Sequence, residues 1–276
     1  MQQDEAIAIV SKVAVLAQGG GGKIAILVRK LGALADLITD EPAKEDISYF
    51  NGLFSDTVPE FFEFNAFALS RITDAASGEK GASRFAADKI IGSISDELLT
   101  CSRRFEYGRS YAMLLRALRK HLTNECVAMG PSERFDYIVS IFSEGSLRRF
   151  SDYLDTDISM MTVHSAKGLA RDTVFIPGVT RFAWPGGICS RCERAGICSR
   201  SAYGCRIVDA MNMPDGLIEE MGLLYVGVTR VRKAVYVSAS MQRGTNNGNY
   251  QVACPSCLTS LPGIESVSGT VMDGEG

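Results

Sequence analysis

The feature that most constrains the fold is a set of short, continuously apolar runs separated by longer segments of helical periodicity. The runs cover Lys23–Arg29, Ile158–Val163, Thr173–Val179 and Ala234–Ser240. Strands that are apolar along their whole length are typical of parallel sheets, because both faces of such a sheet are covered. Alternation of these strands with helices therefore predicts an α/β fold built on a parallel sheet.

Helical periodicity is clearest between Asp4 and Gln18, where apolar residues recur every three or four positions. The glycines Gly19–Gly22 are expected to end this helix. Leu31–Ile38 and Leu217–Arg230 show the same periodicity. From about residue 41 to residue 150 apolar strand runs are absent and helical spacing dominates, which predicts a mainly helical insertion.

The composition excludes several classes of protein. The chain has 276 residues, 46% hydrophobic and 22% charged, which is enough apolar material for a core and excludes disorder of the whole chain. A net charge of −3 excludes a strongly basic, histone-like polyanion binder but permits a local basic stripe. Without a signal peptide or an apolar run long enough to span a bilayer, we expect a cytoplasmic protein, associated with the nucleoid if prokaryotic, and no membrane partner.

Side chains that can carry chemistry lie where the apolar runs and the last helix end. Thr162–Leu169 presents hydroxyl, imidazole and ammonium groups at an edge of the predicted sheet, where open α/β sheets bind ligands. Arg29 ends the first apolar run and Arg230 ends the last helix. A guanidinium at either position is suited to a phosphate, although an arginine at a helix end can also simply cap the helix.

In this order the segments resemble three motifs of the UvrD/Rep family of superfamily 1 DNA helicases. They are similar to motif IV (Ile26-Leu-Val-Arg29), motif V (Thr162-Val-His-Ser-Ala-Lys-Gly-Leu169) and motif VI (Leu224-Tyr-Val-Gly-Val-Thr-Arg230). The resemblance implies a RecA-like 2A domain, formed by residues 1–40 and 151–276, with a helical 2B-like insertion at residues 41–150. It also implies an ATP-dependent DNA helicase that couples hydrolysis to single-strand translocation and duplex unwinding.

The same resemblance implies roles for individual residues. Arg29 and Arg230 are expected to approach the γ-phosphate of ATP bound with Mg²⁺, where cationic groups stabilise the developing charge. Single-stranded DNA is expected to contact Thr162, His164 and Ser165. The residues expected to couple the nucleotide to the strand are Lys167, Gly168, Tyr225 and Thr229.

Parts of the nucleotide site are missing from the sequence. Gly19–Lys23 lacks the first glycine and the hydroxyl residue of a P-loop. The sequence also shows no Walker B motif, in which acidic residues directly follow an apolar strand. We therefore expect an N-terminal RecA-like half, from the same gene or a separate chain, and little ATP hydrolysis by this chain alone. Ala170 stands where the family usually has Glu, and Gly222 where it usually has Arg. These departures favour an alternative, a non-catalytic nucleic-acid-binding or regulatory module.

Four cysteines lie within 17 residues between motifs V and VI: Cys189, Cys192, Cys198 and Cys205. Four thiolates at this spacing are suited to a tetrahedral Zn²⁺ site, and the same ligands also hold iron–sulfur clusters, which we favour less. An exposed loop with unmodified thiols is the alternative.

Basic residues are dense between Ser102 and His121. On a helix, Arg109, Arg116 and Lys120 share one face. Because the 2B region of the family touches duplex DNA, this face is a candidate contact with partly duplex DNA. A solvated helix face explains the same pattern.

Overall fold

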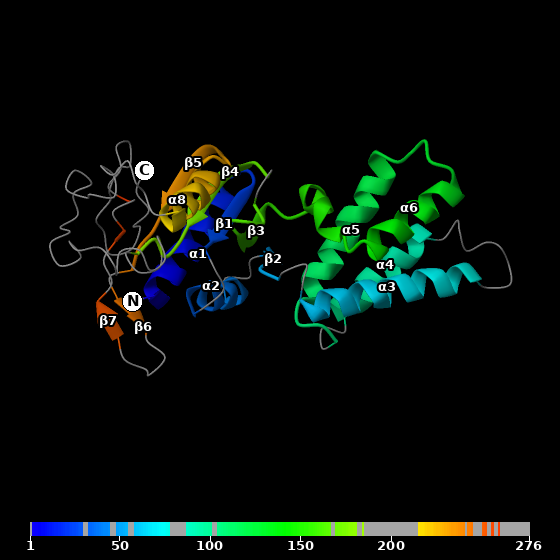
Figure 1. The fold of residues 1–276 in the computed structure, drawn as a ribbon, viewed down its shortest axis with the longest axis horizontal. Helices are drawn as coiled ribbons and strands as arrows, with labels where there is room; N and C mark the ends of the chain where they lie inside the picture. The colour runs from blue at the N-terminus through cyan, green and yellow to red at the C-terminus, as the bar shows by residue number, and fades with distance from the viewer. Residues whose placement is uncertain are drawn as a thin grey trace. The chain divides into compact units, whose positions relative to one another are not determined.

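The computed structural model divides the chain into two compact units, residues 1–49 with 157–276, and residues 50–156 (Figure 1). The sequence-based borders, after residues 40 and 150, fall slightly earlier in the chain. The residues that the structure describes are 2–29, 33–44, 48–54, 58–77, 87–100, 104–166, 169–180, 184, 215–240, 242–244, 250–252, 255–256 and 259.

The sheet of the first unit has five strands in the order β2-β3-β1-β4-β5, and its edge strand β2 is formed by the first residues of the second range, 50–52. The strands are β1 (Ile24–Val28), β2 (Phe50–Gly52), β3 (Ile158–Thr162), β4 (Arg171–Ile176) and β5 (Val231–Val237). β1 pairs in parallel with β3 and β4, and β4 pairs in parallel with β5. The predicted α/β fold with a parallel sheet is confirmed. The edge strand β2 is a correction, because no strand was expected between residues 41 and 150.

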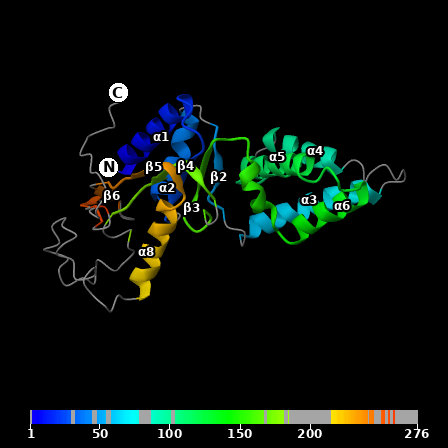
Figure 2. The ribbon, with the colours of Figure 1, turned by 90° about the horizontal axis from the view of Figure 1, so that it is seen from above.

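Helices cover both faces of this sheet, as expected for strands that are apolar throughout. Figure 2 shows α1 (Gln2–Gln18) and α2 (Ala33–Lys44) on one side and α8 (Asp215–Val228) on the other. Under α8, a cluster of buried side chains includes Leu27, Trp184 and Leu224. The site described below lies at the ends of this layer.

A glycine turn joins α1 to β1. The N–H of Gly19 donates to the carbonyl of Val15 (3.0 Å), and that of Gly21 to the carbonyl of Leu16 (2.7 Å). Gly20 and Gly22 have φ values of 71° and 74°, in the left-handed region that glycine adopts without strain. The glycines therefore end the helix, as the sequence predicted.

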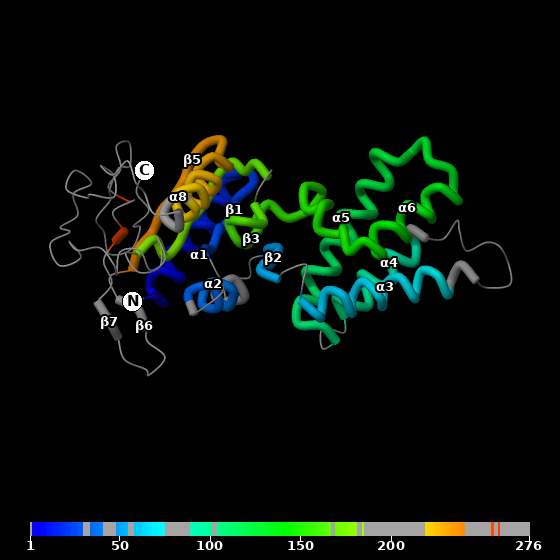
Figure 3. The backbone as a smooth tube through the Cα atoms, in the orientation of Figure 1, coloured from blue at the N-terminus to red at the C-terminus, as the bar shows by residue number. Residues whose placement is uncertain are grey.

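The second unit is helical (Figure 3). Its helices are α3 (Pro59–Ser77), α4 (Ala87–Thr100), α5 (Gly108–Asn124), α6 (Pro131–Ser143) and a 3₁₀ helix, η2 (Leu147–Tyr153). Aromatic rings fill its core: Phe64 and Tyr111 are fully buried and stack with their centroids 4.4 Å apart. This confirms the mainly helical insertion.

Two smaller features complete the described part of the chain. The strands β6 (Gln242–Gly244) and β7 (Tyr250–Val252) form an antiparallel pair. Pro255 forms an isolated antiparallel bridge with Thr180. None of the described helices is both long and apolar enough to cross a bilayer.

Candidate functional site

The sequence-predicted residues gather at two opposite edges of the parallel sheet. The carboxyl edge is where β1, β3, β4 and β5 end, and the amino edge is where they begin. Arg29 directly follows β1, and His164 follows β3. Val28 is paired with Thr162, and the N–H of Val163 donates to the carbonyl of Val28 (3.0 Å). Arg29 and the start of motif V are therefore neighbours at the carboxyl edge.

Hydroxyl groups shape the turn after β3. The Oγ1 of Thr162 lies 2.9 Å from the Oγ of Ser165 and accepts a hydrogen bond from the Ser165 backbone N–H (3.2 Å). This local closure is typical of Ser and Thr at the start of a turn. His164 is exposed and Ser165 is half-buried. The three residues expected to contact a single strand thus lie on one short turn with solvent access.

Arg29 forms an ion pair with Glu220, a residue that the sequence analysis did not single out. The Arg29 Nε donates to Glu220 Oε2 at 2.8 Å, and Nη2 donates to Oε1, so the pair is bidentate. The side chains are 27% and 10% exposed, respectively. The hydrogen bond to Glu220 raises the pKa of Arg29 against the opposing effect of burial. The buried Trp184 donates its indole N–H to the carbonyl of Glu220 (3.0 Å), which fixes the same turn of α8.

Arg230 lies at the other edge. It precedes β5, and its carbonyl accepts the N–H of Arg171 at the start of β4 (2.8 Å). Its guanidinium donates to the carbonyl of Val226 (3.3 Å) and to the hydroxyl of Thr229 (3.2 Å). Val226 lies in the last turn of α8 and Thr229 directly follows the helix, so among the described residues the guanidinium is held by local contacts alone. Tyr225, on the same helix, is 70% exposed.

The segment between β3 and β4, residues 163–170, connects the two edges. Because β3 and β4 are both parallel to β1, this segment leaves the carboxyl edge at Val163 and reaches the amino edge at Ala170. Val163, Ala166 and Leu169 pack in the cluster beneath α8. Lys167 and Gly168, expected to couple nucleotide and strand, lie outside the described residues. We call residues 163–170 the crossing segment.

The structure does not bring Arg29 and Arg230 together. In the register of the sheet, Arg29 extends to the level of Gly178, whereas Arg230 lies at the level of Ala170. The interval corresponds to about 26 Å of strand. Two arginine side chains do not meet on one phosphate across that distance. The expectation that both approach the same γ-phosphate is therefore corrected: each arginine belongs to a different edge.

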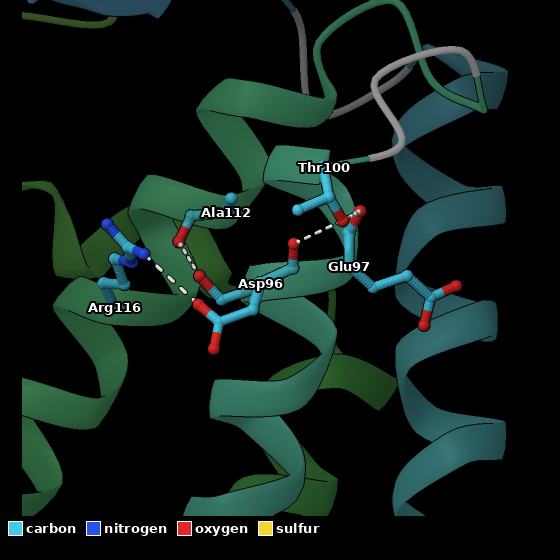
Figure 4. Close-up of polar contacts among 6 residues, drawn as sticks. Asp96, Glu97, Thr100, Ala112 and Arg116 are labelled. Atoms are coloured by element: carbon cyan, nitrogen blue, oxygen red, sulfur yellow. Dashed lines mark hydrogen bonds and ion pairs between the residues drawn. The ribbon is translucent and has the colours of Figure 1, made fainter.

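In the second unit, α5 carries the predicted basic face. Arg116 pairs with Asp96 of α4 (3.2 Å), as Figure 4 shows, and Lys120 pairs with Asp155 (2.6 Å). Arg109 is exposed. Helical placement is confirmed, but two of the three cations already have carboxylate partners. Because the carboxylates of Asp96 and Asp155 are exposed, each ion pair contributes little to the stability of the fold. Both cations therefore remain accessible to a phosphate.

The four cysteines proposed as metal ligands, Cys189, Cys192, Cys198 and Cys205, lie outside the described residues. Among the described residues, no group of three or more histidine, cysteine or acidic side chains is arranged to hold a metal ion. Cys126 is buried in the core of the second unit, as expected for an ordinary thiol.

Comparison with known proteins identifies the class. Residues 103–242, half of the chain, match the UvrD-like helicase C-terminal domain, and the chain belongs to this family. Relatives of known name include the "Probable DNA helicase II homolog" of Rickettsia felis and the "DNA helicase II" of Rickettsia typhi. Each is 30% identical over 113 residues, which cover 40% of this chain and 14% of the relative. The matched part of the chain thus spans about one seventh of these relatives.

Proposed function

We propose that the chain is the second motor domain of an ATP-dependent DNA helicase and works with an N-terminal RecA-like half. The observation that carries this proposal is the crossing segment. It begins beside Thr162 and His164 at the carboxyl edge and ends beside Arg230 at the amino edge. Its described residues Val163, Ala166 and Leu169 pack beneath α8, and its two ends lie at the proposed strand-binding edge and the proposed nucleotide-binding edge, as coupling of hydrolysis to translocation requires.

At the carboxyl edge, the proposed ligand is the sugar–phosphate backbone of single-stranded DNA. Thr162, Ser165 and His164 supply hydroxyl and imidazole groups of the kind that contact phosphate oxygens. Arg29 adds a positive charge beside them. Most of the affinity at such an edge is electrostatic and falls with salt.

At the amino edge, the proposed ligand is ATP with Mg²⁺, shared with the N-terminal half. A guanidinium has five N–H groups, and Arg230 uses few of them for the carbonyl of Val226 and the hydroxyl of Thr229. The remaining donors suit phosphate oxygens. When ATP is bound, the role of Arg230 is to stabilise charge on the transferred phosphoryl group, an effect of about 10³–10⁵ in rate where it has been measured.

The test is DNA-stimulated ATPase activity of the chain alone and mixed with the N-terminal RecA-like half from the same source. We expect activity in the mixture alone and its loss in Arg230→Ala. Arg232→Ala is the matched control, because Arg232 is an exposed arginine two residues further on. Equal activity of Arg230→Ala and Arg232→Ala would contradict the role of Arg230.

A second candidate is a non-catalytic nucleic-acid-binding module, and one observation favours it. Ala170, in place of the usual Glu, lies beside Arg230 at the amino edge, so a carboxylate is missing where the nucleotide is proposed to bind. Single-strand binding without ATPase activity in either sample would support this candidate.

We also propose that the protein works in the cytoplasm, where chromosomal DNA is its substrate.

A last proposal is that the Cys189–Cys205 segment binds one Zn²⁺. Elemental analysis of the purified protein checks the metal: one zinc per chain is expected. Absence of zinc and iron, together with alkylation of Cys192 and Cys198 under native conditions, would refute it.

A further inference from the structure

Helix α8 is anchored at both edges of the sheet. Glu220, in its second turn, is tied to Arg29 at the carboxyl edge, and Arg230 follows its last turn at the amino edge. The eight residue steps from Glu220 to Val228, the last residue of α8, rise about 12 Å along the helix. A displacement of one end of a rigid helix is transmitted to the other.

The anchor at Glu220 is specific. The side chain of Glu220 is only 10% exposed, so its negative charge needs a partner. The planar guanidinium of Arg29 donates two hydrogen bonds to it. The indole of Trp184 holds the backbone of the same residue at 3.0 Å. A lysine in place of Arg29 could not reproduce this bidentate geometry.

The last turn of α8 packs closely against β4. A Cβ built on Gly227 would lie 3.0 Å from Ile176 Cδ1 and 3.8 Å from Val163 Cγ1. The tight contact is with Ile176 of β4, whereas Val163, the first residue of the crossing segment, lies at an ordinary van der Waals distance. In a densely packed interior, a displacement of this end of α8 is passed to both side chains. Helix α8 therefore contacts Arg29 through Glu220 and approaches the turn after β3 at Gly227.

Arg29 lies beside the proposed strand-binding turn. It directly follows Val28, which pairs with Thr162, and its side chain is 27% exposed. A phosphate that approaches this turn meets a guanidinium already bound to a carboxylate. Phosphate and carboxylate bind guanidinium in the same bidentate geometry, so the two anions compete for it.

We propose that Glu220 is a positioning residue that couples strand binding to Arg230. A phosphodiester of the bound single strand draws Arg29 away from Glu220, and the weakened anchor lets α8 shift and carry Arg230 towards the nucleotide. This inference rests on the proposed function for its link to ATP. The competition at Arg29 stands independently and is tested by binding alone.

The binding experiment uses the 276-residue chain and a fluorescent oligothymidylate, measured by anisotropy. Glu220→Gln keeps the shape of the side chain but removes the competing charge, so we expect binding to tighten about threefold to tenfold. Glu219→Gln is the matched control, an exposed glutamate of the same helix. Adding Arg29→Ala to Glu220→Gln is expected to abolish the gain. A purely structural role of Glu220 would not tighten binding, and equal affinity of the two glutamine variants overturns the proposal.

The coupling arm uses the mixture with the N-terminal half. In Glu220→Gln, whose anchor to Arg29 is already weakened, we expect the ATPase rate without oligothymidylate to rise and the ratio of the rates with and without it to fall at least threefold. If the wild-type mixture has no ATPase activity, the proposed function fails, and the binding arm still decides the competition at Arg29. If Glu220→Gln does not fold, Arg29→Lys replaces it: lower DNA stimulation with near-normal affinity supports the proposal, and unchanged stimulation overturns it.

Discussion

Glu60 and Tyr111 give the sharpest test of the packing of the helical unit. The carboxylate of Glu60, on α3, accepts the backbone N–H groups of Glu106 (2.9 Å) and Tyr107 (3.1 Å) and the hydroxyl of Tyr111 (2.9 Å). Tyr107, the residue that precedes α5, makes no capping hydrogen bond with its own side chain. Glu60 therefore stabilises the start of α5 from a distant helix, with a negative charge at a helix N-terminus.

The size of the effect follows from these three hydrogen bonds. Each bond to a charged group contributes about 1.5–3 kcal/mol when buried, but Glu60 is half-buried and the bonds are not additive. We therefore expect Glu60→Ala to lower the free energy of unfolding by about 3 kcal/mol. Tyr111→Phe alone is expected to cost about 1 kcal/mol, because it removes one hydrogen bond.

The double variant gives the decisive sign. In Glu60→Ala the hydroxyl of the fully buried Tyr111 has lost its acceptor, so removing the hydroxyl should now stabilise the protein by about 1 kcal/mol. Urea unfolding followed by circular dichroism at 222 nm measures the helices. Fluorescence of Trp184, the single tryptophan, reports the first unit separately. Glu63→Ala, an exposed acid on α3, is the control. Equal destabilisation by Tyr111→Phe in both backgrounds would refute the reasoning.

Four further outcomes are expected. A hydrogen bond from the backbone N–H of Lys23 lowers the pKa of Asp172, so the ionised carboxylate stabilises the fold above its ordinary pKa, and this stability is lost as the pH falls through the lowered pKa. In Asp172→Asn, the urea midpoint should therefore fall less steeply below about pH 4. Burial raises the pKa of Tyr111, so the protonated hydroxyl contributes its full stability below its ordinary pKa, and this stability is lost at higher pH. Tyr111→Phe should therefore lose less stability than the wild type above about pH 10. Gly227→Val overpacks the contact with β4 and should cost about 1–3 kcal/mol in thermal unfolding, whereas Gly222→Ala, with no neighbour within 4 Å, should stabilise by about 0.5–1 kcal/mol.

The sheet was predictable because its strands have a strong local signal. The run Lys23–Arg29 contains β1, and Ile158–Val163 contains β3, because apolar residues filled every position of a strand buried on both faces. The short strand β2 has no such signal. Three residues in a Phe-rich segment show neither alternation nor a long apolar run, so only tertiary pairing reveals them.

The sequence placed the candidate site residues on their elements but did not predict their geometry; their roles stay predictions. Arg29 and Arg230 were found because each ends an element. Their separation depends on sheet direction, since a residue after β1 and a residue before β5 lie at opposite edges whatever motif they resemble. The partner of Arg29 was not predictable, because Glu220 lies 191 positions away and only the packing of α8 brings it near.

The insertion of the second unit between β1 and β3 determines the order in which the chain can fold. Ile24 and Ile158 are adjacent in the sheet, yet they are separated by more than 130 residues of sequence. Closing a flexible loop of that length costs about 4 kcal/mol in chain entropy beyond the constant term. A helical unit rich in local contacts forms faster than such a pairing. Once this unit has folded, only the two stretches of chain that connect it to the sheet still contribute to the loop between β1 and β3, so this loop is shorter. We therefore expect the helices of the second unit to assemble first and the strands of the sheet to pair afterwards, so that a variant that unfolds the second unit delays the burial of Trp184 in the first.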